Sequence, residues 1–295
     1  MYKIINKKDK EFPPLLLEIN DTPERLFYIG NISKLQDKEM KILCIVGSRK
    51  YSNYGKEVTE KLISEIKGYN ICIVSGLALG IDSIAHRSAI DNGLYTIAFP
   101  GSGLHREVMY PTTHRQLADE IIEKGGALFS EFELKQKAQE WTFPQRNRLM
   151  AGISHATLII EAGVKSGTMI TARRAMEYNR DVAIIPGEIF DPLREGPHSL
   201  MRDGAVPITC SDDLLELLGF SRREGQSSLN FKDNNILENL NENERKILGI
   251  LQIESCNKNT LINRLGMDTK VANIIISSME LEGLIEDIDG RIKIK

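Results

Sequence analysis

The sequence predicts an α/β protein in which residues 1–220 form one domain around a mainly parallel sheet and a small domain follows near the C-terminus. Two observations indicate this fold class. Short β-branched apolar runs alternate with helix-length amphipathic stretches, the pattern of parallel strands joined by crossover helices. After residue 220 the chain becomes polar and then returns to short amphipathic segments. Its 295 residues, 41% of them apolar, suffice for a large core.

Six strands are predicted from residue 41 onward, each from a short apolar run. Five of these runs end at or beside glycine, where the chain can turn sharply into the next helix. A further run, LFYIG at 26–30, follows two prolines and is expected to be an edge strand of the same domain. The six runs are KILCIVG (41–47), ICIVSG (71–76), LYTIAFPG (94–101), GALFSEF (126–132), ATLIIEA (156–162) and DVAIIPG (181–187).

The loops after these strands are where a ligand is expected. Carboxyl ends of parallel strands meet at one edge of a sheet, and ligands of open α/β folds bind there. The corresponding loops are residues 47–54, 75–82, 100–110, 163–168 and 186–195.

The C-terminal part is predicted to be a linker at residues 221–234 and a domain at 235–295. The linker is polar, with Gly and Ser and little to bury. Three amphipathic segments then predict helices, LNENERKILGIL, NTLINRLG and DTKVANIIISSMELEGL, and two alternating strands flank Asp289 and Gly290. Three helices and a hairpin are typical of a winged helix.

Composition excludes several classes of protein. No apolar run approaches the roughly 20 residues of a spanning helix, and the first residues do not resemble a signal peptide, so a cytoplasmic protein without membrane contact is expected. The four cysteines are far apart, which disfavours a zinc site or a disulfide framework. The net charge is −3, so binding to nucleic acid would require a local basic cluster.

Motifs for nucleotides, metals and catalysis are weak. Neither G-x-x-x-x-G-K-[ST] nor G-x-G-x-x-G occurs. Asp82 and His86 would share a helix face, but Asp82 is better explained as an N-cap. Glu161 ends a strand, where it could be a general base or a carboxylate that fixes a loop by accepting N–H bonds. We predict no catalytic residue, no metal and no cofactor.

Phosphate is the ligand that the loops suit best. The stretch EAGVKSGTMITARRA (161–175) passes from a strand through small residues into a helix, and such a turn offers backbone N–H groups to an anion. Basic residues follow several strands, although any single arginine could instead be solvated or ion-paired, and one of Arg173 and Arg174 is expected to point away. The predicted phosphate-binding residues are Ser48, Arg49, Lys50, Gly76, Arg146, Asn147, Arg148, Lys165, Ser166, Gly167, Thr168 and Arg173.

Over residues 12–219 the chain resembles the DNA processing protein DprA/Smf family. The resemblance rests on six ordered stretches: GSRKYSNYG, SGLALGIDSIAHRSAI, TIAFPGSGLHREVMYP, FPQRNRLMAGIS, EAGVKSGTMITARRAMEYNRDVAIIPG and LMRDGA. It implies an extended Rossmann-like fold, sequence-independent binding of single-stranded DNA, a homodimer, and help in loading the RecA recombinase during natural transformation. The family's phosphate-contacting arginine corresponds to Arg49, and its basic FPxRNR stretch to Arg146 and Arg148.

Two positions depart from the family pattern. Leu79 stands where an arginine is common, and Gln145 stands where a lysine is frequent. Each change removes a positive charge from the expected groove, so we expect binding to persist but to be weaker. The family's N-terminal helical module is expected to be absent.

The expected DNA-reading helix of the winged helix is unusually acidic. Residues 268–282 contain one lysine and three acids, whereas helices that read a groove present Arg, Lys, Asn or Gln. We therefore expect a protein contact or a structural role there.

An enzyme is the main alternative. Nucleotide phosphoribohydrolases of the LOG type carry a P-G-G-x-G-T-x-x-E loop, and SGTMIT resembles half of it. The position of the glutamate is Thr171 here, which cannot act as a carboxylate base.

Overall fold

The computed structural model describes residues 2–220, 241–253, 256–281, 284–288 and 291–294. It contains two compact units, Met1–Arg222 and Arg223–Lys295, which are described separately. The linker predicted at residues 221–234 lies outside the described residues.

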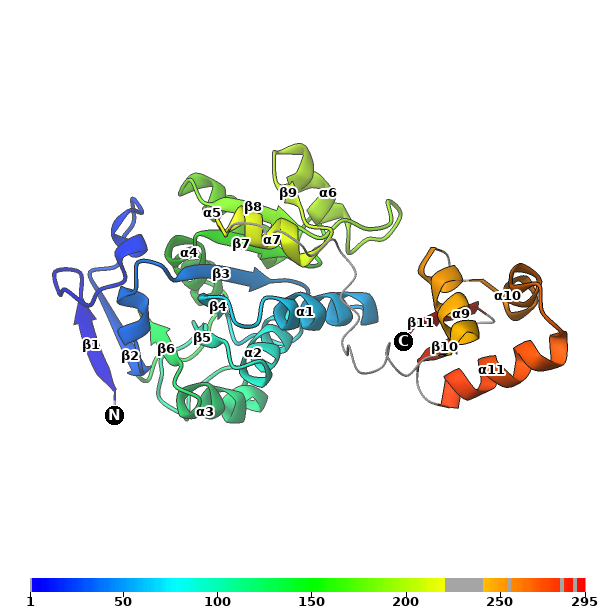
Figure 1. Ribbon diagram of the computed structural model, residues 1–295. Coiled ribbons are helices and arrows are strands. Elements are labelled where there is room, and N and C mark those ends of the chain that lie inside the picture. Colours follow the sequence, from blue (N-terminus) through cyan, green and yellow to red (C-terminus); the bar gives the residue numbers. More distant parts are fainter. Residues whose placement is uncertain (1, 221–240, 254–255, 282–283, 289–290, 295) are drawn as a thin grey trace. The chain divides into compact units, whose positions relative to one another are not determined.

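The first unit is built on a mainly parallel sheet, as predicted, and this sheet has nine strands (Figure 1). All six predicted strands are present and parallel to their neighbours within this set. From β3 the order proceeds through β4, β5 and β6 in one direction and through β7, β8 and β9 in the other. In sheet order the strands are β1 (Lys3–Asn6), β2 (Arg25–Gly30), β6 (Ala127–Ser130), β5 (Tyr95–Ala98), β4 (Ile71–Ser75), β3 (Lys41–Val46), β7 (Ala156–Ile159), β8 (Asp181–Ile184) and β9 (Val206–Pro207).

The LFYIG segment is not an edge strand, contrary to the expectation. It forms β2, which pairs antiparallel with β1 on one side and with β6 on the other. The edge strand is β1. This strand is short and only one of its four residues is buried, so its sequence did not predict a strand.

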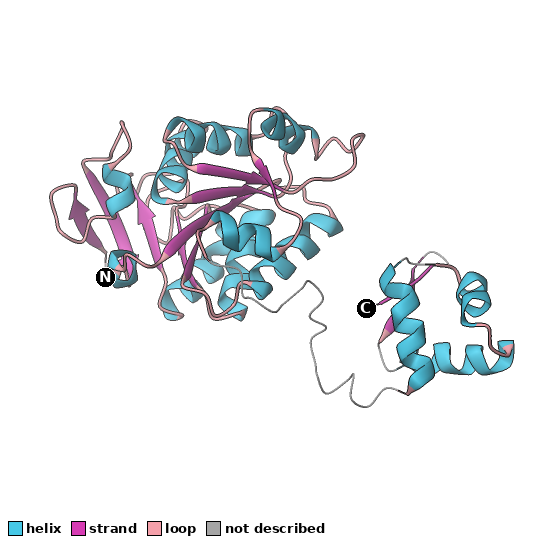
Figure 2. Ribbon diagram, turned by 45° about the horizontal axis from the view of Figure 1, so that its top comes forward, coloured by secondary structure: helices cyan, strands magenta, loops and turns pink. Residues whose placement is uncertain are grey.

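Helices cover both faces of the sheet (Figure 2). The central strands are buried on both sides because their apolar residues alternate between two cores. In β3, Ile42 and Cys44 pack in the core with α4 and α5, and Leu43 and Ile45 pack in the core with α1 and α2. The helices are α1 (Asn53–Glu65), α2 (Ile81–Asp91), α3 (Arg115–Glu123), α4 (Thr142–Ile153), α5 (Gly167–Glu177), α6 (Glu195–Arg202) and α7 (Ser211–Leu217), with 3₁₀ turns at Pro14–Leu17, Ser33–Gln36 and Thr112–His114.

Side chains at the helix starts explain two of the boundaries. Ser52 caps α1 by accepting a bond from Gly55 N at 3.0 Å, and Ser166 caps α5 by accepting from Thr168 N at 3.2 Å. Asp82 is not the N-cap of α2, contrary to the expectation. Gly80 occupies that position, and Asp82 lies inside the first turn.

The second unit contains three helices followed by a two-stranded antiparallel sheet. These are α9 (Glu242–Ile253), α10 (Lys258–Leu265), α11 (Thr269–Leu281), β10 (Ile285–Ile288) and β11 (Arg291–Ile294). The elements follow the predicted order, and their apolar residues form a separate core. The winged-helix assignment stays a prediction.

No helix among the described segments is both long enough and apolar enough to cross a bilayer. The same segments contain no cluster of three His, Cys, Asp or Glu that could hold a metal ion.

Candidate nucleic-acid interface

The sheet order creates the place for a site. Chain connections leave β3 and β7 in opposite directions, so the loops after these neighbouring strands border the crevice where open α/β folds bind ligands. The two loops contact each other: Thr168 donates its hydroxyl hydrogen to Gly47 O at 3.0 Å, and Ser52 N donates to Glu161 Oε2 at 3.0 Å.

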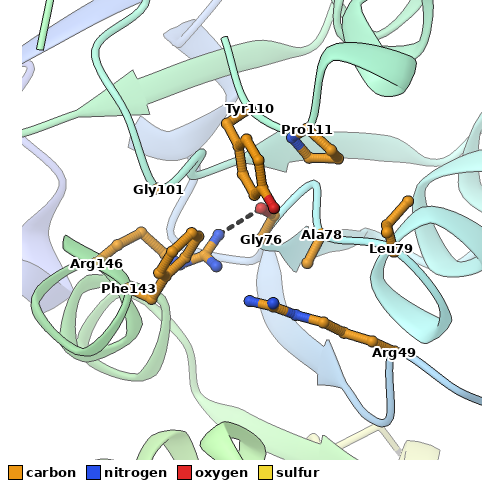
Figure 3. A pocket seen from close by; sticks show the side chains of 9 residues that line it. All are labelled: Arg49, Gly76, Ala78, Leu79, Gly101, Tyr110, Pro111, Phe143 and Arg146. Atoms are coloured by element: carbon orange, nitrogen blue, oxygen red, sulfur yellow. Dashed lines mark hydrogen bonds between the residues drawn. The ribbon is translucent and has the colours of Figure 1, made fainter. Parts of the chain in front are cut away.

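A pocket lies beside this crevice, among the loops after β3, β4 and β5 and the first turns of α4. We call it the Arg49 pocket (Figure 3). Its lining residues are Arg49, Gly76, Ala78, Leu79, Gly101, Tyr110, Pro111, Phe143 and Arg146.

Arg49 lies at the rim of the pocket. Its guanidinium reaches toward the Phe143 ring, with Cζ 5.1 Å from the ring centroid (Figure 3). Tyr110 meets the same ring edge-on, with centroids 5.8 Å apart. Within the described residues, Arg49 makes no hydrogen bond or ion pair, and it is exposed to solvent. An arginine that no carboxylate neutralises can bind an external anion.

Arg146 forms the floor of the pocket and is only 4% exposed. It donates to the carbonyl oxygens of Gly76 and Phe99 and, through Nε, to Asn147 Oδ1 at 3.0 Å. Burial lowers the pKa of Arg146 to about 10, and the nearby Asp82 carboxylate opposes this shift. Arg146 therefore remains charged at neutral pH, and its Nη1 and Nε are bonded within the protein.

Asp82 and His86 continue this buried polar layer beneath the pocket. Asp82 accepts a bond from Gly76 N at 3.0 Å, and burial raises the pKa of its carboxyl. His86 Nδ1 is 2.8 Å from Thr96 Oγ1, and burial lowers the pKa of the imidazole to about 3. Asp82 and the Nδ1 of His86 therefore have partners inside the protein, whereas the buried His86 Nε2 has none among the described residues.

Two glycines make room for the pocket. A Cβ on Gly76 would collide with the Arg146 guanidinium, and one on Gly101 would lie 2.6 Å from the Phe143 ring. Gly76 is among the predicted site residues, whereas Gly101 is not. The sequence signal that could have identified Gly101 is its position directly after Pro100, at the end of a predicted strand.

Arg148 occupies a different environment from Arg49. Its Nη2 bonds both Glu131 oxygens, at 2.6 and 2.5 Å, and Nη1 donates to Asp21 O at 2.5 Å. The side chain is 11% exposed. The predicted convergence of free guanidinium groups therefore does not extend to Arg148, because this group is neutralised by a carboxylate.

The Gly loop, residues 163–168, is joined to the floor of the Arg49 pocket. Asn147 accepts from Arg146 and donates through Nδ2 to Gly167 O at 3.3 Å. Lys165 and Gly167 are exposed, and Thr168 is buried with its hydroxyl bound to Gly47 O. The Gly167 N–H has no acceptor among the described residues and can serve an external anion.

Some of the remaining predicted residues are free to bind an anion, and others are bonded within the protein. The Ser48 hydroxyl holds its own loop, donating to Lys50 O at 2.7 Å and accepting from Lys50 N at 3.0 Å. The Lys50 side chain is exposed, as is Arg173 on α5. Arg174 pairs with Glu177 at 2.7 Å. One arginine of the Arg173 and Arg174 pair is thus tied to a carboxylate.

Glu161 was predicted to be either a general base or a carboxylate that fixes a loop. Its contacts agree with the second role. It is fully buried and accepts bonds from the backbone and hydroxyl of Ser52. Arg194, 2% exposed, binds Glu161 Oε1 through Nη2 at 2.8 Å and lies 4.8 Å from the Tyr54 ring centroid. The loop that contains Arg194 is among those expected to bind a ligand, but Arg194 itself gives no local signal because its partner is distant in the chain.

Comparison with known proteins identifies the family. Residues 3–219 match the family model of DNA recombination-mediator protein A. Protein Smf from Escherichia coli is 40% identical over 213 residues, which cover 72% of this chain and 56% of Smf. The chain therefore spans little more than half the length of that relative.

Two solved structures of DNA processing protein A are similar. The one from Streptococcus pneumoniae has a TM-score of 0.68 and 39% identity, with 73% of this chain and 74% of the other covered. The one from Helicobacter pylori, reported for its single-stranded DNA binding mode, has a TM-score of 0.65 and 29% identity, covering 74% and 95%. These structures support the extended Rossmann-like fold expected for the first unit. This chain belongs to the DNA recombination-mediator protein A family, known as DprA or Smf.

Proposed function

We propose that this chain binds single-stranded DNA without sequence preference at the Arg49 pocket and the Gly loop. The observation that carries the proposal is the state of Arg49. Its guanidinium is exposed, forms no ion pair in the described part of the chain, and lies over an aromatic ring at the mouth of a pocket.

Phosphate groups would bind at the exposed donors. Arg49 and Lys50 follow β3, and Lys165 and the Gly167 N–H follow β7, so cationic and amide donors flank one crevice. Such donors follow the sugar-phosphate backbone and do not distinguish bases. No catalytic group is required for this function, and Glu161 is buried in its ion pair with Arg194.

One nucleobase would stack at the mouth of the Arg49 pocket. Tyr110 and Phe143 offer aromatic surfaces, and every base has a π face that can stack on them. At the floor, Arg146 Nη1 already donates to two protein carbonyls. Stacking on aromatic rings does not distinguish one base from another.

The relatives support a role in DNA recombination. The family model is described as a recombination mediator, and the Helicobacter pylori relative was reported for binding single-stranded DNA. We propose that this protein acts in the cytoplasm as a homodimer, protects incoming DNA during natural transformation and helps to load RecA recombinase. The shared motifs support these properties.

The test measures fluorescence anisotropy of labelled single strands of unrelated sequence, with the full chain, at several salt concentrations. Arg49→Ala is expected to weaken binding by roughly tenfold or more, the effect of removing a charge-assisted hydrogen bond to phosphate. The slope of log affinity against log salt should fall by about 0.7 for each phosphate that the protein no longer neutralises.

Arg148→Ala is the matched control, because it removes the same side chain from an ion-paired position. Its effect on binding should be several times smaller. Equal effects of the two substitutions, or unchanged binding by Arg49→Ala, would contradict the site. Turnover of nucleoside monophosphates that is abolished by Glu161→Gln would instead support the hydrolase alternative.

A further inference from the structure

The only tryptophan of the chain, Trp141, is held at the surface by two contacts. The indole meets the buried Phe132 ring at 85°, with centroids 5.6 Å apart, and its Nε1 donates to Gln139 Oε1. Trp141 nevertheless remains 51% exposed. A large ring that is both fixed and exposed can stack on a ligand with little further loss of side-chain freedom.

Trp141 lies beside the Arg49 pocket and outside its lining. It directly precedes α4, and Phe143, two residues later, supplies an aromatic wall of the pocket (Figure 3). Residues two apart on a helix do not face each other, so the indole points elsewhere than the Phe143 ring. Thr142, between the two, donates its hydroxyl hydrogen to Gly101 O at 2.6 Å, which fixes the start of α4 against the pocket.

The loop that leads to Trp141 is joined to a loop that lines the pocket. Gly103 N donates to Gln136 O, and His105 N donates to Leu134 O, both at 2.9 Å. These bonds connect the loop after β6 with the loop after β5, which also contains Tyr110 of the pocket. The two loops therefore form one rim, along which a strand bound at the pocket mouth can continue toward Trp141.

Free positive charge accompanies the indole in the loop after β6. Lys135 and Lys137 are exposed, and neither forms an ion pair with another described residue. Two of the three glutamates in residues 131–141 are ion-paired with arginines, and the third, Glu140, has no such partner among the described residues. Two free cations thus face one free carboxylate beside an exposed aromatic ring, a combination suited to a single-stranded nucleic acid.

We propose that Trp141 stacks on a second nucleobase of the bound single strand, beyond the base at the mouth of the Arg49 pocket. This inference rests on the proposed function and extends its site. Lys135 and Lys137 bind phosphates of the same segment, and the indole accepts any base because every base has a π face. In the sheet, β6 and β7 lie on opposite sides of β3, so Trp141 and the Gly loop hold opposite ends of the bound segment.

The fluorescence of Trp141 tests the contact directly, because no other tryptophan contributes to the emission. Unlabelled single strands of unrelated sequence, added to the full chain at low salt, should quench this emission. The quenching should saturate at the same DNA concentrations as the anisotropy of a labelled strand. Saturated anisotropy with unchanged tryptophan emission would overturn the proposal.

Substitutions measure the contribution of the ring. Trp141→Ala should weaken single-strand binding by roughly fivefold or more, the usual effect of removing one stacking partner, and Trp141→Phe should restore most of the affinity. Phe190→Ala is the matched control, because it removes another exposed ring, on the loop after β8, that has an exposed Glu188 nearby in place of the lysines. An equal loss in Phe190→Ala would show a general effect of removing an exposed ring and would overturn the assignment.

The lysines and the pocket are tested separately. The double substitution Lys135→Ala, Lys137→Ala should reduce the salt slope by about 0.7 for each phosphate that is no longer neutralised, whereas Trp141→Ala should leave the slope unchanged. Normal binding by Trp141→Ala together with impaired binding by Arg49→Ala would overturn the role of Trp141 and leave the Arg49 site intact. Unchanged binding by Arg49→Ala would contradict the Arg49 site itself, and this inference with it.

Discussion

Arg49 and Arg146 line the same pocket and carry the same chemical group, yet they lie in opposite environments. Arg49 is exposed at the rim beside Phe143, with no ion pair in the described part of the chain. Arg146 is buried at the floor, where it bonds two backbone carbonyls beside Asp82. A basic cluster in a sequence can therefore contain two kinds of residue. One kind is free to bind the ligand, and the other holds the loops that present it.

The largest expected effect is on stability and concerns the floor. Arg146→Ala leaves two buried carbonyls without their donor and removes the buried cation near Asp82, so the free energy of unfolding should fall by about 3–5 kcal/mol. Urea denaturation measures this loss. Arg49→Ala is the control and should change the free energy of unfolding by no more than about 0.5 kcal/mol. Similar losses of unfolding free energy in both variants would contradict the assignment of Arg146 to a structural role and of Arg49 to ligand binding.

The second effect is a loss of folding stability at low pH, and it is caused by the buried His86. Burial places the pKa of His86 at about 3 in the folded chain, below the unfolded value of about 6.5. The unfolded state therefore binds the proton first, and stability is lost as pH falls from about 6.5 toward 3. At pH 5 the loss from this group should be about 2 kcal/mol.

Urea denaturation at pH 7, 6 and 5 measures this dependence. In His86→Gln the free energy of unfolding should fall less between pH 7 and pH 5 than in the unaltered chain. This holds even if the variant is less stable at every pH. Asp82, whose pKa burial raises, acts in the opposite direction, and the difference between the two proteins removes its contribution. Parallel stability curves for the two proteins would contradict the assignment to His86.

A third effect is expected when a cation is added to the rim. Leu79 is 46% exposed and lines the Arg49 pocket. Leu79→Arg should strengthen single-strand binding by up to about tenfold at low salt and make the salt slope steeper by about 0.7, because one more phosphate is neutralised. Leu79→Gln, which adds a long polar side chain without charge, is the control. Equal binding by the two variants would show that Leu79 lies outside the path of the strand.

The smallest effect is expected at the Gly loop. Lys165 is exposed and forms no ion pair among the described residues, so Lys165→Ala should weaken single-strand binding only a few-fold, as expected of a flexible surface charge. Anisotropy at low salt measures this change. Lys67→Ala, an exposed lysine on the connection between α1 and β4, is the control. A loss at Lys165 larger than that of Arg49→Ala would move the centre of the site from the pocket to the Gly loop.

Much of the sheet could be predicted because its signal is local. Strands such as β3 and β7 consist of apolar runs that must be buried on both faces, and the start of α5 follows from Ser166 and the small residues around it. The position of β2 could not be predicted, because it depends on antiparallel pairing with β6, about a hundred residues away in the chain. Likewise, no local pattern shows that Phe143 and Tyr110 would meet beside Arg49.

The alternation of strands and helices, the loops where a ligand can bind, and the family motifs that contain Arg49 and the Gly loop all follow from the order of residues alone. Which arginines remain free depends on how the chain folds. Arg148 is neutralised by Glu131 and Arg194 by Glu161, and Arg146 is buried against Gly76 and Phe99. The availability of a charge depends on the groups within a few ångströms of it. Those groups are brought together from distant parts of the chain by the packing of α4 and the loops after β6, β7 and β8 on the sheet.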